Sequence, residues 1–367
     1  MTKRTPVSPG RRLLAGSLSV HPIGMGCWAI GGADHNLGMP MGWSTADDAA
    51  AMRGLEAACE LGANLFDTAD VYGHGHSERL LGRLVRTAGR HGLVLSSKTG
   101  YFAGTAEHPY LPSAMRRQLE TTLENLGTDH LDIYFLHNSE FGPEDRHLDD
   151  AITQMRAFKK QGLVRAIGMR GPHRFAPDRL ALAKGQREDK HARFRRLFTA
   201  IAPDCLAVRF NALTPVPDGP DSIFAFAAEH GASVLVNKPL AQGLLTGKHD
   251  PDQPPAFGPG DHRLRKAWFT PAALRIIRDG LQPLRDRYGP DPGHLAPVMI
   301  AYCLAQSPDA VVLAGFTTPQ QVSQNLAPPA WPLTDDDIGF IRATAGAIQQ
   351  RLDAAGEVFL DEAGATA

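Results

Sequence analysis

Four polar side chains stand at or just after the ends of three apolar stretches of this sequence. Asp67 and Tyr72 follow the first stretch, Lys98 the second and His137 the third. The stretches lie at residues 64–66, 93–97 and 132–136. In a parallel α/β barrel the carboxyl ends of the strands meet at one face, where catalytic groups gather. We therefore expect these four side chains to share one site.

This set of side chains suits acid–base chemistry at a carbonyl oxygen. A free tyrosine has a pKa near about 10, so it is protonated at neutral pH and can donate a proton. A cation close to the phenol makes it a stronger acid. Lys98 can supply that charge, Asp67 can hold Lys98 in place, and His137 can hydrogen-bond the substrate oxygen and polarise it.

The glycine-rich loop that carries Tyr72 holds further polar groups. Asp70, His74 and His76 in one loop raise the alternative of a metal site, but a glycine separates the two histidines and the loop defines no ligand geometry. We expect no metal and interpret the three residues as substrate-side or surface groups. Three aromatic residues either line an apolar pocket mouth or serve in packing. They are Trp28, Tyr101 and Phe102.

Three motifs carry a resemblance to a known family. They read Gly-x-Asn-x-x-Asp-Thr-Ala-x-x-Tyr-Gly at 62–73, Ser-Ser-Lys-Thr-Gly at 96–100 and Tyr-Phe-Leu-His at 134–137. Their order and spacing resemble those of the aldo-keto reductases, and the likeness extends over about 18–326. The resemblance implies a (β/α)8 TIM barrel, an NADPH cofactor and reduction of an aldehyde or ketone. It also implies that Tyr72 is the proton donor, with Lys98, Asp67 and His137 in the roles described above.

Two later segments are similar to the cofactor-binding segments of this family. Residues 238–248 resemble the pyrophosphate loop, and residues 315–325 resemble the adenosine-phosphate segment. A nicotinamide dinucleotide needs such contacts for its phosphates and bases. The resemblance therefore implies a set of residues that contact NADP(H), some of them at the redox end. They are Trp28, Arg170, Asn237, Lys238, Leu240, Gly243, Lys248, Gly315, Thr318, Gln321 and Asn325.

The chain departs from the family pattern around the nicotinamide. Met169-Arg170-Gly171 replaces the usual Ser-Asn pair, and Ala207 stands in place of a glutamine. Asn237 replaces the aromatic residue that stacks on the nicotinamide, and Thr317 replaces an arginine for the 2′-phosphate. The residues at the adenine end of the expected cofactor site therefore resemble the family pattern, whereas those at the nicotinamide end differ from it.

Two further functions remain open at this point. One is a non-redox acid–base enzyme, such as a lyase, dehydratase or isomerase, that uses the altered nicotinamide subsite for its substrate. The other is a cofactor-binding regulatory subunit, in which the four polar residues would have no catalytic role. The substrate-specificity loops at 28–43, 101–112, 138–146 and 249–268 are rich in Gly, Pro, His and charged residues. They favour a polar, sugar-like substrate over a steroid-like one.

The composition fits a globular enzyme without nucleic-acid or membrane partners. Of the 367 residues 43% are hydrophobic, and the net charge is −1. Four widely spaced cysteines argue against a disulfide framework, and neither a signal peptide nor an apolar membrane span is evident. We expect a cytoplasmic enzyme whose partner is a small molecule. Nothing in the sequence specifies an oligomeric state.

Alternating apolar patterns predict a single barrel domain at 18–352, between tails at 1–17 and 353–367. A glycine-rich first strand near 23–28 precedes strands at 64–66, 93–97, 131–136, 163–168, 205–210, 232–236 and 310–314. Helices are expected at 44–61, 78–86, 111–126, 148–160, 176–184, 220–229, 294–305 and 333–352. The basic segment 184–196 is interpreted as a solvated helix face, with a phosphate-contacting patch as the alternative.

Overall fold

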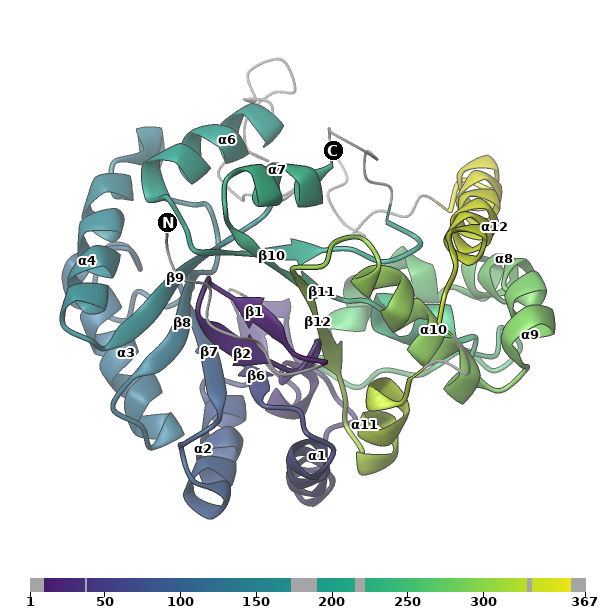
Figure 1. The fold of residues 1–367 in the computed structure, drawn as a ribbon, viewed down its shortest axis with the longest axis horizontal. Coiled ribbons are helices and arrows are strands. Elements are labelled where there is room, and N and C mark those ends of the chain that lie inside the picture. Colours follow the sequence, from purple (N-terminus) through teal and green to yellow (C-terminus); the bar gives the residue numbers. More distant parts are fainter. Residues whose placement is uncertain (1–9, 37, 173–189, 215–221, 329–331, 358–367) are drawn as a thin grey trace.

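The computed structural model describes residues 10–36, 38–172, 190–214, 222–328 and 332–357, and its central element is a closed barrel of eight parallel strands. Figure 1 shows these strands as a ring surrounded by helices. The order around the ring is β10-β11-β12-β3-β6-β7-β8-β9. The strands are β3 (Ile23–Gly26), β6 (Leu65–Asp67), β7 (Val94–Thr99), β8 (Leu131–Leu136), β9 (Val164–Arg170), β10 (Cys205–Arg209), β11 (Ser233–Asn237) and β12 (Ala310–Gly315). The barrel expected from the sequence is confirmed.

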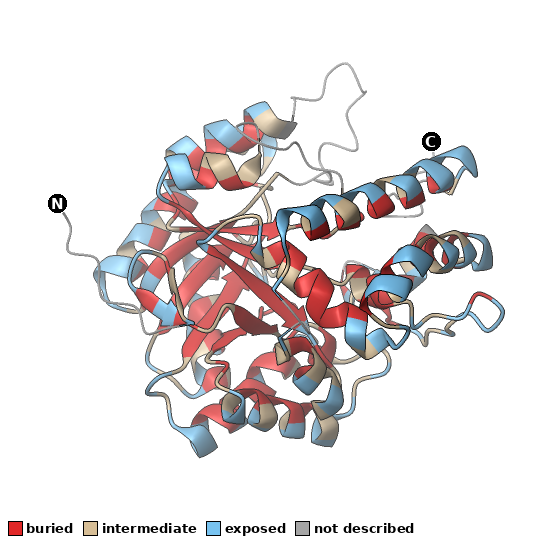
Figure 2. Ribbon diagram, turned by 45° about the vertical axis from the view of Figure 1, so that its right-hand side comes forward, coloured by how far each residue is buried: buried red, intermediate tan, exposed pale blue. Residues whose placement is uncertain are grey.

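Amphipathic helices cover the outside of the ring. Figure 2 shows their inner faces buried against the strands and their outer faces exposed. They are α1 (Asp48–Glu60), α2 (His76–Ala88), α3 (Pro112–Leu126), α4 (Leu148–Lys160), α6 (Lys190–Ile201), α7 (Ile223–Glu229), α10 (Pro292–Leu304) and α11 (Pro319–Leu326). Three more helices, α8 (Pro271–Gly280), α9 (Gln282–Tyr288) and α12 (Asp335–Ala354), form a separate layer beside α10. The helix expected at 176–184 lies outside the described residues.

The first helix starts later than the sequence indicates. Asp47 is its N-cap and accepts a hydrogen bond from Ala50 N, whereas Ser44, the first residue of the predicted helix range and a residue type that commonly caps helices, bonds to Asp261 in a distant loop. The hydroxyl to carboxylate distance is 2.8 Å. A tertiary contact has therefore replaced the local cap at Ser44.

A hairpin near the amino terminus closes one end of the barrel. Its strands are β1 (Arg12–Leu14) and β2 (Leu18–Val20), so part of the expected tail at 1–17 is folded. Leu14, Leu18 and Val20 pack on the barrel interior. The Arg12 guanidinium donates to the Ser307 carbonyl, 3.0 Å away, just before β12. The hairpin therefore caps the amino ends of the strands, and the opposite end remains for a site.

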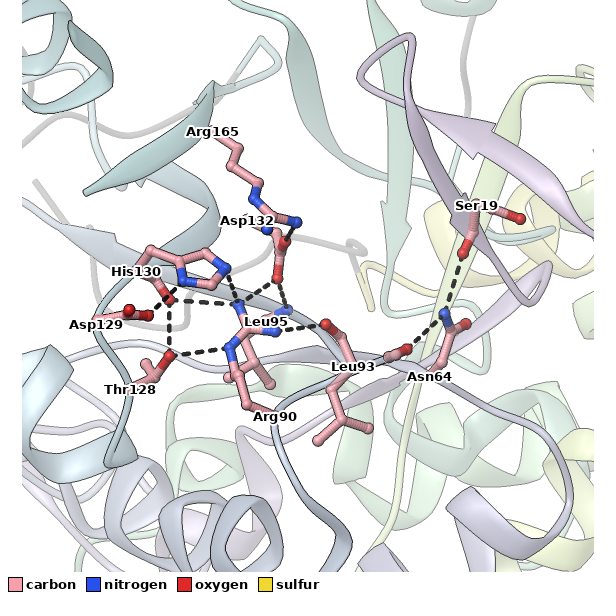
Figure 3. A network of polar contacts seen from close by, with 11 residues as sticks. Ser19, Asn64, Arg90, Leu93, Leu95, Thr128, Asp129, His130, Asp132 and Arg165 are labelled. Atoms are coloured by element: carbon pink, nitrogen blue, oxygen red, sulfur yellow. Dashed lines mark hydrogen bonds and ion pairs between the residues drawn. The ribbon is translucent and has the colours of Figure 1, made fainter. Parts of the chain in front are cut away.

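A polar network fastens the amino ends of β7, β8 and β9 (Figure 3). The Asp132 carboxylate is fully buried and accepts hydrogen bonds from Arg90, Leu95 N and Arg165 at 2.7, 2.8 and 2.9 Å. Close by, the Asn64 amide donates to the Ser19 carbonyl at 3.0 Å and so joins β2 to β6. Charge-assisted bonds in a buried setting are the strong ones, so this network holds the barrel floor in register.

The described part of the basic segment, residues 190–196, does not form a wholly solvated helix face, and residues 184–189 lie outside the described chain. Arg193 of α6 is 6% exposed, and its guanidinium pairs with the Asp145 carboxylate and donates to the Ser139 carbonyl. One arginine of the segment therefore ties α6 to the loop after β8. In the described part of the chain, no helix is long and apolar enough to span a membrane.

Candidate active site

The expected aspartate and lysine form a buried ion pair at the carboxyl ends of β6 and β7. Lys98 Nζ lies 2.7 Å from Asp67 Oδ2, and Ser96 Oγ donates to Asp67 Oδ1 at 2.6 Å. The strand register places Asp67 opposite Ser96, which explains why one carboxylate bonds both side chains. Burial alone lowers the pKa of Lys98, but the charge of Asp67 and the contact with Tyr72 outweigh it and raise the pKa. Lys98 is therefore charged at neutral pH.

Tyr72 lies on the cavity side of this ion pair. Lys98 Nζ is 4.8 Å from the centre of the Tyr72 ring. Burial raises the pKa of the Tyr72 phenol above its ordinary value, and the charge of Lys98 offsets part of that rise. The phenol is thus protonated at neutral pH and is placed to give a proton to a bound group.

His137 completes the group from the end of β8. Its ring centre lies 6.0 Å from that of Tyr72 and 4.8 Å from that of Tyr101, in edge-on contacts. His137 N donates to the Thr99 carbonyl at 2.8 Å, which continues the sheet by one residue. The structure therefore brings together the four side chains that the sequence singled out.

Behind the site lie two buried carboxyl groups. Glu78 accepts hydrogen bonds from Ser97, Thr122 and Asn125 at 2.7, 2.9 and 2.9 Å. Asp70 accepts one from Val71 N, whereas its Oδ2 has no hydrogen-bond partner in the described chain. Burial, reinforced by the charge of Glu78, holds the pKa of Asp70 well above its ordinary value. Asp70 is thus neither a substrate-side nor a surface group, which corrects our sequence interpretation.

One cavity of about 400 Å³ is lined by the four side chains of the site and by residues of the expected cofactor segments. Its wall contains nearly all of the side chains proposed from sequence for catalysis or cofactor binding. These are Trp28, Asp67, Tyr72, Lys98, His137, Arg170, Asn237, Lys238, Leu240, Gly243, Lys248, Gly315, Gln321 and Asn325. Thr318 instead caps α11, where its hydroxyl accepts a hydrogen bond from Gln321 N at 3.3 Å, while the neighbouring Thr317 lines the cavity.

The segment after β11 shapes one part of the cavity as an anion cradle. Ala241, Gln242 and Gly243 all have positive φ, within the 3₁₀ turn η5 (Ala241–Thr246). A Cβ at Gly243 would lie 2.6 Å from Cε of Lys248, so this glycine lets the lysine stem pass close to the backbone. The amide oxygen and nitrogen of Gln242 have no hydrogen-bond partner among the described residues. Turns of this kind with a basic side chain suit phosphate groups.

Two long loops meet to form a roof, which consists of residues 28–36 and 38–47 after β3 and residues 249–270 after β11. Arg263 donates to both Asp261 oxygens, at 2.9 and 2.7 Å, and its guanidinium is sandwiched between the rings of Trp43 and Phe257. The distances to these two ring centres are 3.8 and 4.1 Å. Asp261 also accepts the Ser44 bonds, so one arginine–aspartate pair joins both loops.

Sequence reasoning missed four basic or imidazole side chains of the second roof loop that line the cavity. They are His262, Arg263, Arg265 and Lys266. The His262 ring centre lies 4.6 Å from that of Trp28, and neither ring nitrogen has a hydrogen-bond partner in the described chain. Burial, with the charge of Lys238 and its basic neighbours, places the pKa of His262 well below its ordinary value, so the ring is neutral. The run His-Arg-Leu-Arg-Lys was the available signal, but an aperiodic loop does not show which way its side chains point.

The remaining loop residues take surface roles. His74 Nδ1 lies 2.7 Å from Asp34, and His76 Nε2 lies 2.8 Å from Asp48. The Phe102 ring packs on His74 with centres 4.9 Å apart, whereas Tyr101 lines the cavity. No group of three or more His, Cys, Asp or Glu able to hold a metal ion occurs in the described part of the chain.

Comparison with known proteins agrees with this geometry. A sequence model of the Aldo/keto reductase family matches residues 22–345. The fold is similar to that of glycerol dehydrogenase from Gluconobacter oxydans, with a TM-score of 0.67 at 24% identity over 94% of this chain and 95% of that one. The chain belongs to the aldo/keto reductase family, as the sequence motifs implied, and it is an oxidoreductase of that family.

Two relatives of known activity match most of the chain. The NADH-specific methylglyoxal reductase of Escherichia coli (strain K12) is 26% identical over 348 residues, which cover 91% of this chain and 97% of the relative. The chloroplastic pyridoxal reductase of Arabidopsis thaliana is 30% identical over 346 residues, which cover 90% and 84%. Both are named as reductases of carbonyl compounds, and the family uses nicotinamide cofactors.

Proposed function

We propose that this protein reduces an aldehyde or ketone with NADPH, with Tyr72 as the proton donor. The observation that carries the proposal is the convergence of Tyr72, charged Lys98 and His137 on one wall of a cavity that continues into the phosphate cradle. A reductase needs a hydride donor and a proton donor on the same carbonyl, and this cavity has room for both.

The residues present fit a nicotinamide dinucleotide. The unpartnered Gln242 amide and the positive-φ turn at Ala241–Thr246 offer contacts to phosphate groups, and Lys248 adds positive charge. Gly315, Gln321 and Asn325 line the same cavity at the start of α11. When bound, the cofactor supplies the hydride.

The side chains of the site then act on the carbonyl oxygen. His137 orients and polarises the oxygen, and Tyr72 Oη gives it a proton as negative charge grows there. Lys98 stabilises the phenolate that remains, and Asp67 fixes Lys98 through the 2.7 Å ion pair. The roof around Arg263 borders the cavity and shields bound reactants in part from solvent, which strengthens these electrostatic effects.

The preference for NADPH over NADH rests on the charge of the roof. Arg263, Arg265 and Lys266 line the cavity together with Lys248, and the extra phosphate of NADPH carries about two negative charges. The relative from Escherichia coli is named as NADH-specific, so both nucleotides belong in the test. Fluorescence titration should give a dissociation constant for NADPH at least about tenfold below that for NADH. Equal affinities, or tighter NADH, would contradict the NADPH assignment.

The proton-donor role is tested with Tyr72→Phe. The variant should bind NADPH like the parent protein but lose about 10²–10⁴-fold in kcat, because it keeps the ring and lacks the proton. Unchanged turnover of a confirmed carbonyl substrate would remove Tyr72 from this role.

A second function is favoured by the altered nicotinamide end. Ala207 and Asn237 line the cavity where the family pattern has a glutamine and a stacking aromatic ring. In this alternative Tyr72 and Lys98 act as acid and base on a substrate that occupies this space, without redox chemistry. Turnover by protein stripped of nucleotide would support it, and strict dependence on added NADPH or NADH would exclude it.

A further inference from the structure

His262 is a buried polar side chain whose ring nitrogens have no hydrogen-bond partner among the described residues. The residue is only 5% exposed and lines the cavity. Leaving a buried polar group without a partner costs free energy, and native proteins satisfy nearly all such groups. A ligand bound in the cavity can supply the missing partner, so His262 marks a place where a ligand is contacted.

The backbone of the two roof loops fixes the position of this ring. His262 begins the turn η6 (His262–Arg265), and its peptide N–H donates to the Gly42 carbonyl of the first roof loop at 2.9 Å. A Cβ at Gly42 would lie 2.2 Å from the Gly32 carbonyl oxygen, so the chain can pass this closely only with glycine there. The imidazole is thus held at the cavity wall by the main chain, and its own nitrogens stay available.

Trp28 contacts both His262 and the proposed proton donor. The centre of its ring lies 4.6 Å from that of His262 and 6.1 Å from that of Tyr72. The indole N–H of Trp28 donates to the Met41 carbonyl at 2.8 Å, so the indole offers the cavity apolar surface. These contacts place His262 within reach of a substrate whose carbonyl lies at Tyr72, beyond the carbon atoms that pack on Trp28.

The charge state of His262 determines which ligand group fits it. Burial, reinforced by the positive charges around it, holds the pKa of His262 well below its ordinary value, so one ring nitrogen donates and the other accepts. A hydroxyl group can donate or accept and therefore pairs with either nitrogen. A carboxylate or phosphate oxygen only accepts, and a plain hydrocarbon chain does neither. The site at His262 therefore suits an uncharged, hydroxylated compound.

We propose that His262 determines substrate specificity by hydrogen-bonding a hydroxyl group of the substrate, so that the preferred substrate is a hydroxyaldehyde or hydroxyketone. The inference rests on the proposed carbonyl reduction and adds the substrate class. Trp28 contributes apolar surface for the carbon atoms between the hydroxyl and the carbonyl, and His262 fixes their orientation. This arrangement gives a structural reason for the polar, sugar-like substrate that the loop composition favours.

The first test compares matched substrates that differ in their hydroxyl groups. D-glyceraldehyde is paired with propanal, and D-erythrose with butanal, on the full-length protein with NADPH and with rates referred to the free aldehyde. The hydroxylated member of at least one pair should have a kcat/KM higher by about tenfold or more, because a plain chain leaves the buried imidazole without a partner. A parent protein that prefers the plain aldehyde in both pairs, or shows no preference, would overturn the proposal.

Variants at His262 assign the preference to this side chain. His262→Phe keeps a ring against Trp28 but has no hydrogen-bonding atoms, and it should lower the ratio of kcat/KM between hydroxylated and plain aldehydes by about tenfold, mainly through KM. His262→Gln keeps a donor and an acceptor and should restore part of the ratio. His91→Phe, at an exposed histidine shortly before β7, is the matched control and should keep the ratio of the parent protein.

Two results with His262→Phe would contradict the proposal. An equal loss for hydroxylated and plain aldehydes would show that the ring serves the packing of the roof. A dissociation constant for NADPH raised about tenfold or more in fluorescence titration would make His262 a nucleotide contact, whereas we expect a change of less than about threefold.

The hydroxyl contact and the proposed function can fail separately. If the protein binds no nicotinamide nucleotide and reduces no carbonyl, the proposed function fails. Saturation-transfer NMR with erythritol, a polyol without a carbonyl group, still tests the contact on the parent protein. Binding that His262→Phe abolishes supports the contact, whereas no binding to the parent protein, or binding that the variant retains, overturns it.

Discussion

Lys98 Nζ donates to Asp67 Oδ2 over 2.7 Å, between two side chains that are both almost completely shielded from solvent. A buried ion pair of this kind stabilises a protein little compared with apolar residues of the same size, but removing one partner strands the other charge. The ion pair therefore contributes more to the chemistry of the site than to the stability of the fold. Substitutions can separate its effect on activity from its effect on stability.

Replacing the lysine should damage both activity and stability. Lys98→Met should reduce kcat by about 10²–10⁴-fold because Tyr72 loses the cation that stabilises its phenolate. The same change should destabilise the protein by about 3–5 kcal/mol in urea unfolding, since Asp67 stays buried and unpaired. Adding Asp67→Asn should restore stability but not kcat. Lys160→Met, at an exposed lysine, is the control. If the double variant Lys98→Met/Asp67→Asn is no more stable than Lys98→Met alone, this account is contradicted.

The rate of carbonyl reduction should depend little on pH near neutrality. The pKa of Tyr72 is raised by burial, so the proton that it donates stays in place between about pH 6 and 9 and is lost only as the pH rises through the elevated pKa. In the oxidation direction the phenolate is the active form, and that rate should increase with pH. We would measure kcat in both directions over this range; a fall in the reduction rate centred near pH 7 would point to another proton donor.

The roof should control how tightly the ligands are held. Arg263→Lys keeps the charge but loses the paired hydrogen bonds to Asp261 and the stacking between Trp43 and Phe257. We expect the KM values for nucleotide and carbonyl to rise by about tenfold with little change in kcat, because the catalytic group is not touched. Arg275→Lys, at an exposed arginine–aspartate pair on α8, is the matched control. A fall in kcat without a change in KM would show that the roof acts on the chemical step.

Stability should decrease on acidification because of a half-buried histidine. Burial, with the charge of Lys248, lowers the pKa of His249 to about 4. The unfolded chain has the ordinary value near about 6.5 and binds the proton first, so stability is full above that pH and is lost as the pH falls towards 4. The loss from this group amounts to at most about 3 kcal/mol.

His249→Gln should flatten this pH dependence. We would compare the free energy of unfolding of the parent protein and the variant between about pH 4 and 7. The exposed His91→Gln serves as the control. An unchanged slope in His249→Gln would assign the acid sensitivity to other groups.

The polar network at the barrel floor should affect stability without touching catalysis. Asp132→Asn keeps the shape of the side chain but removes the charge that Arg90 and Arg165 contact. We expect a loss of about 2–4 kcal/mol in the free energy of unfolding and an unchanged kcat/KM, since the network lies at the end of the barrel opposite the cavity. The neighbouring, exposed Asp129→Asn should leave the unfolding midpoint unchanged. A large loss of activity at full stability would show coupling from the floor to the site.

The convergence of Asp67, Tyr72, Lys98 and His137 was predictable from sequence because these residues follow apolar stretches whose pattern fixes a strand. Lys98 lies inside β7 and His137 directly after β8, as the strand ends indicated. The outer helices were predictable for the same reason, and α4 matches its expected bounds at 148–160. Local hydrophobic periodicity thus predicts both the strands of the barrel and the residues at their carboxyl ends.

Other features depend on contacts between distant segments and leave no local pattern. Ser44 has the sequence of a helix cap, yet Asp261, far along the chain, binds its hydroxyl. Asp70 has the sequence position of a loop residue that faces the substrate, yet the packing of α2 buries it beside Glu78. The roof residues around Arg263 belong to an aperiodic loop, so their direction is decided by packing on Trp43 and Phe257.

The hairpin of β1 and β2 has a consequence for access to the site. It covers the amino ends of the strands, where Leu14, Leu18 and Val20 pack with core side chains of the barrel interior. A ligand therefore cannot pass through the barrel from that end and has to reach the cavity from the carboxyl ends of the strands.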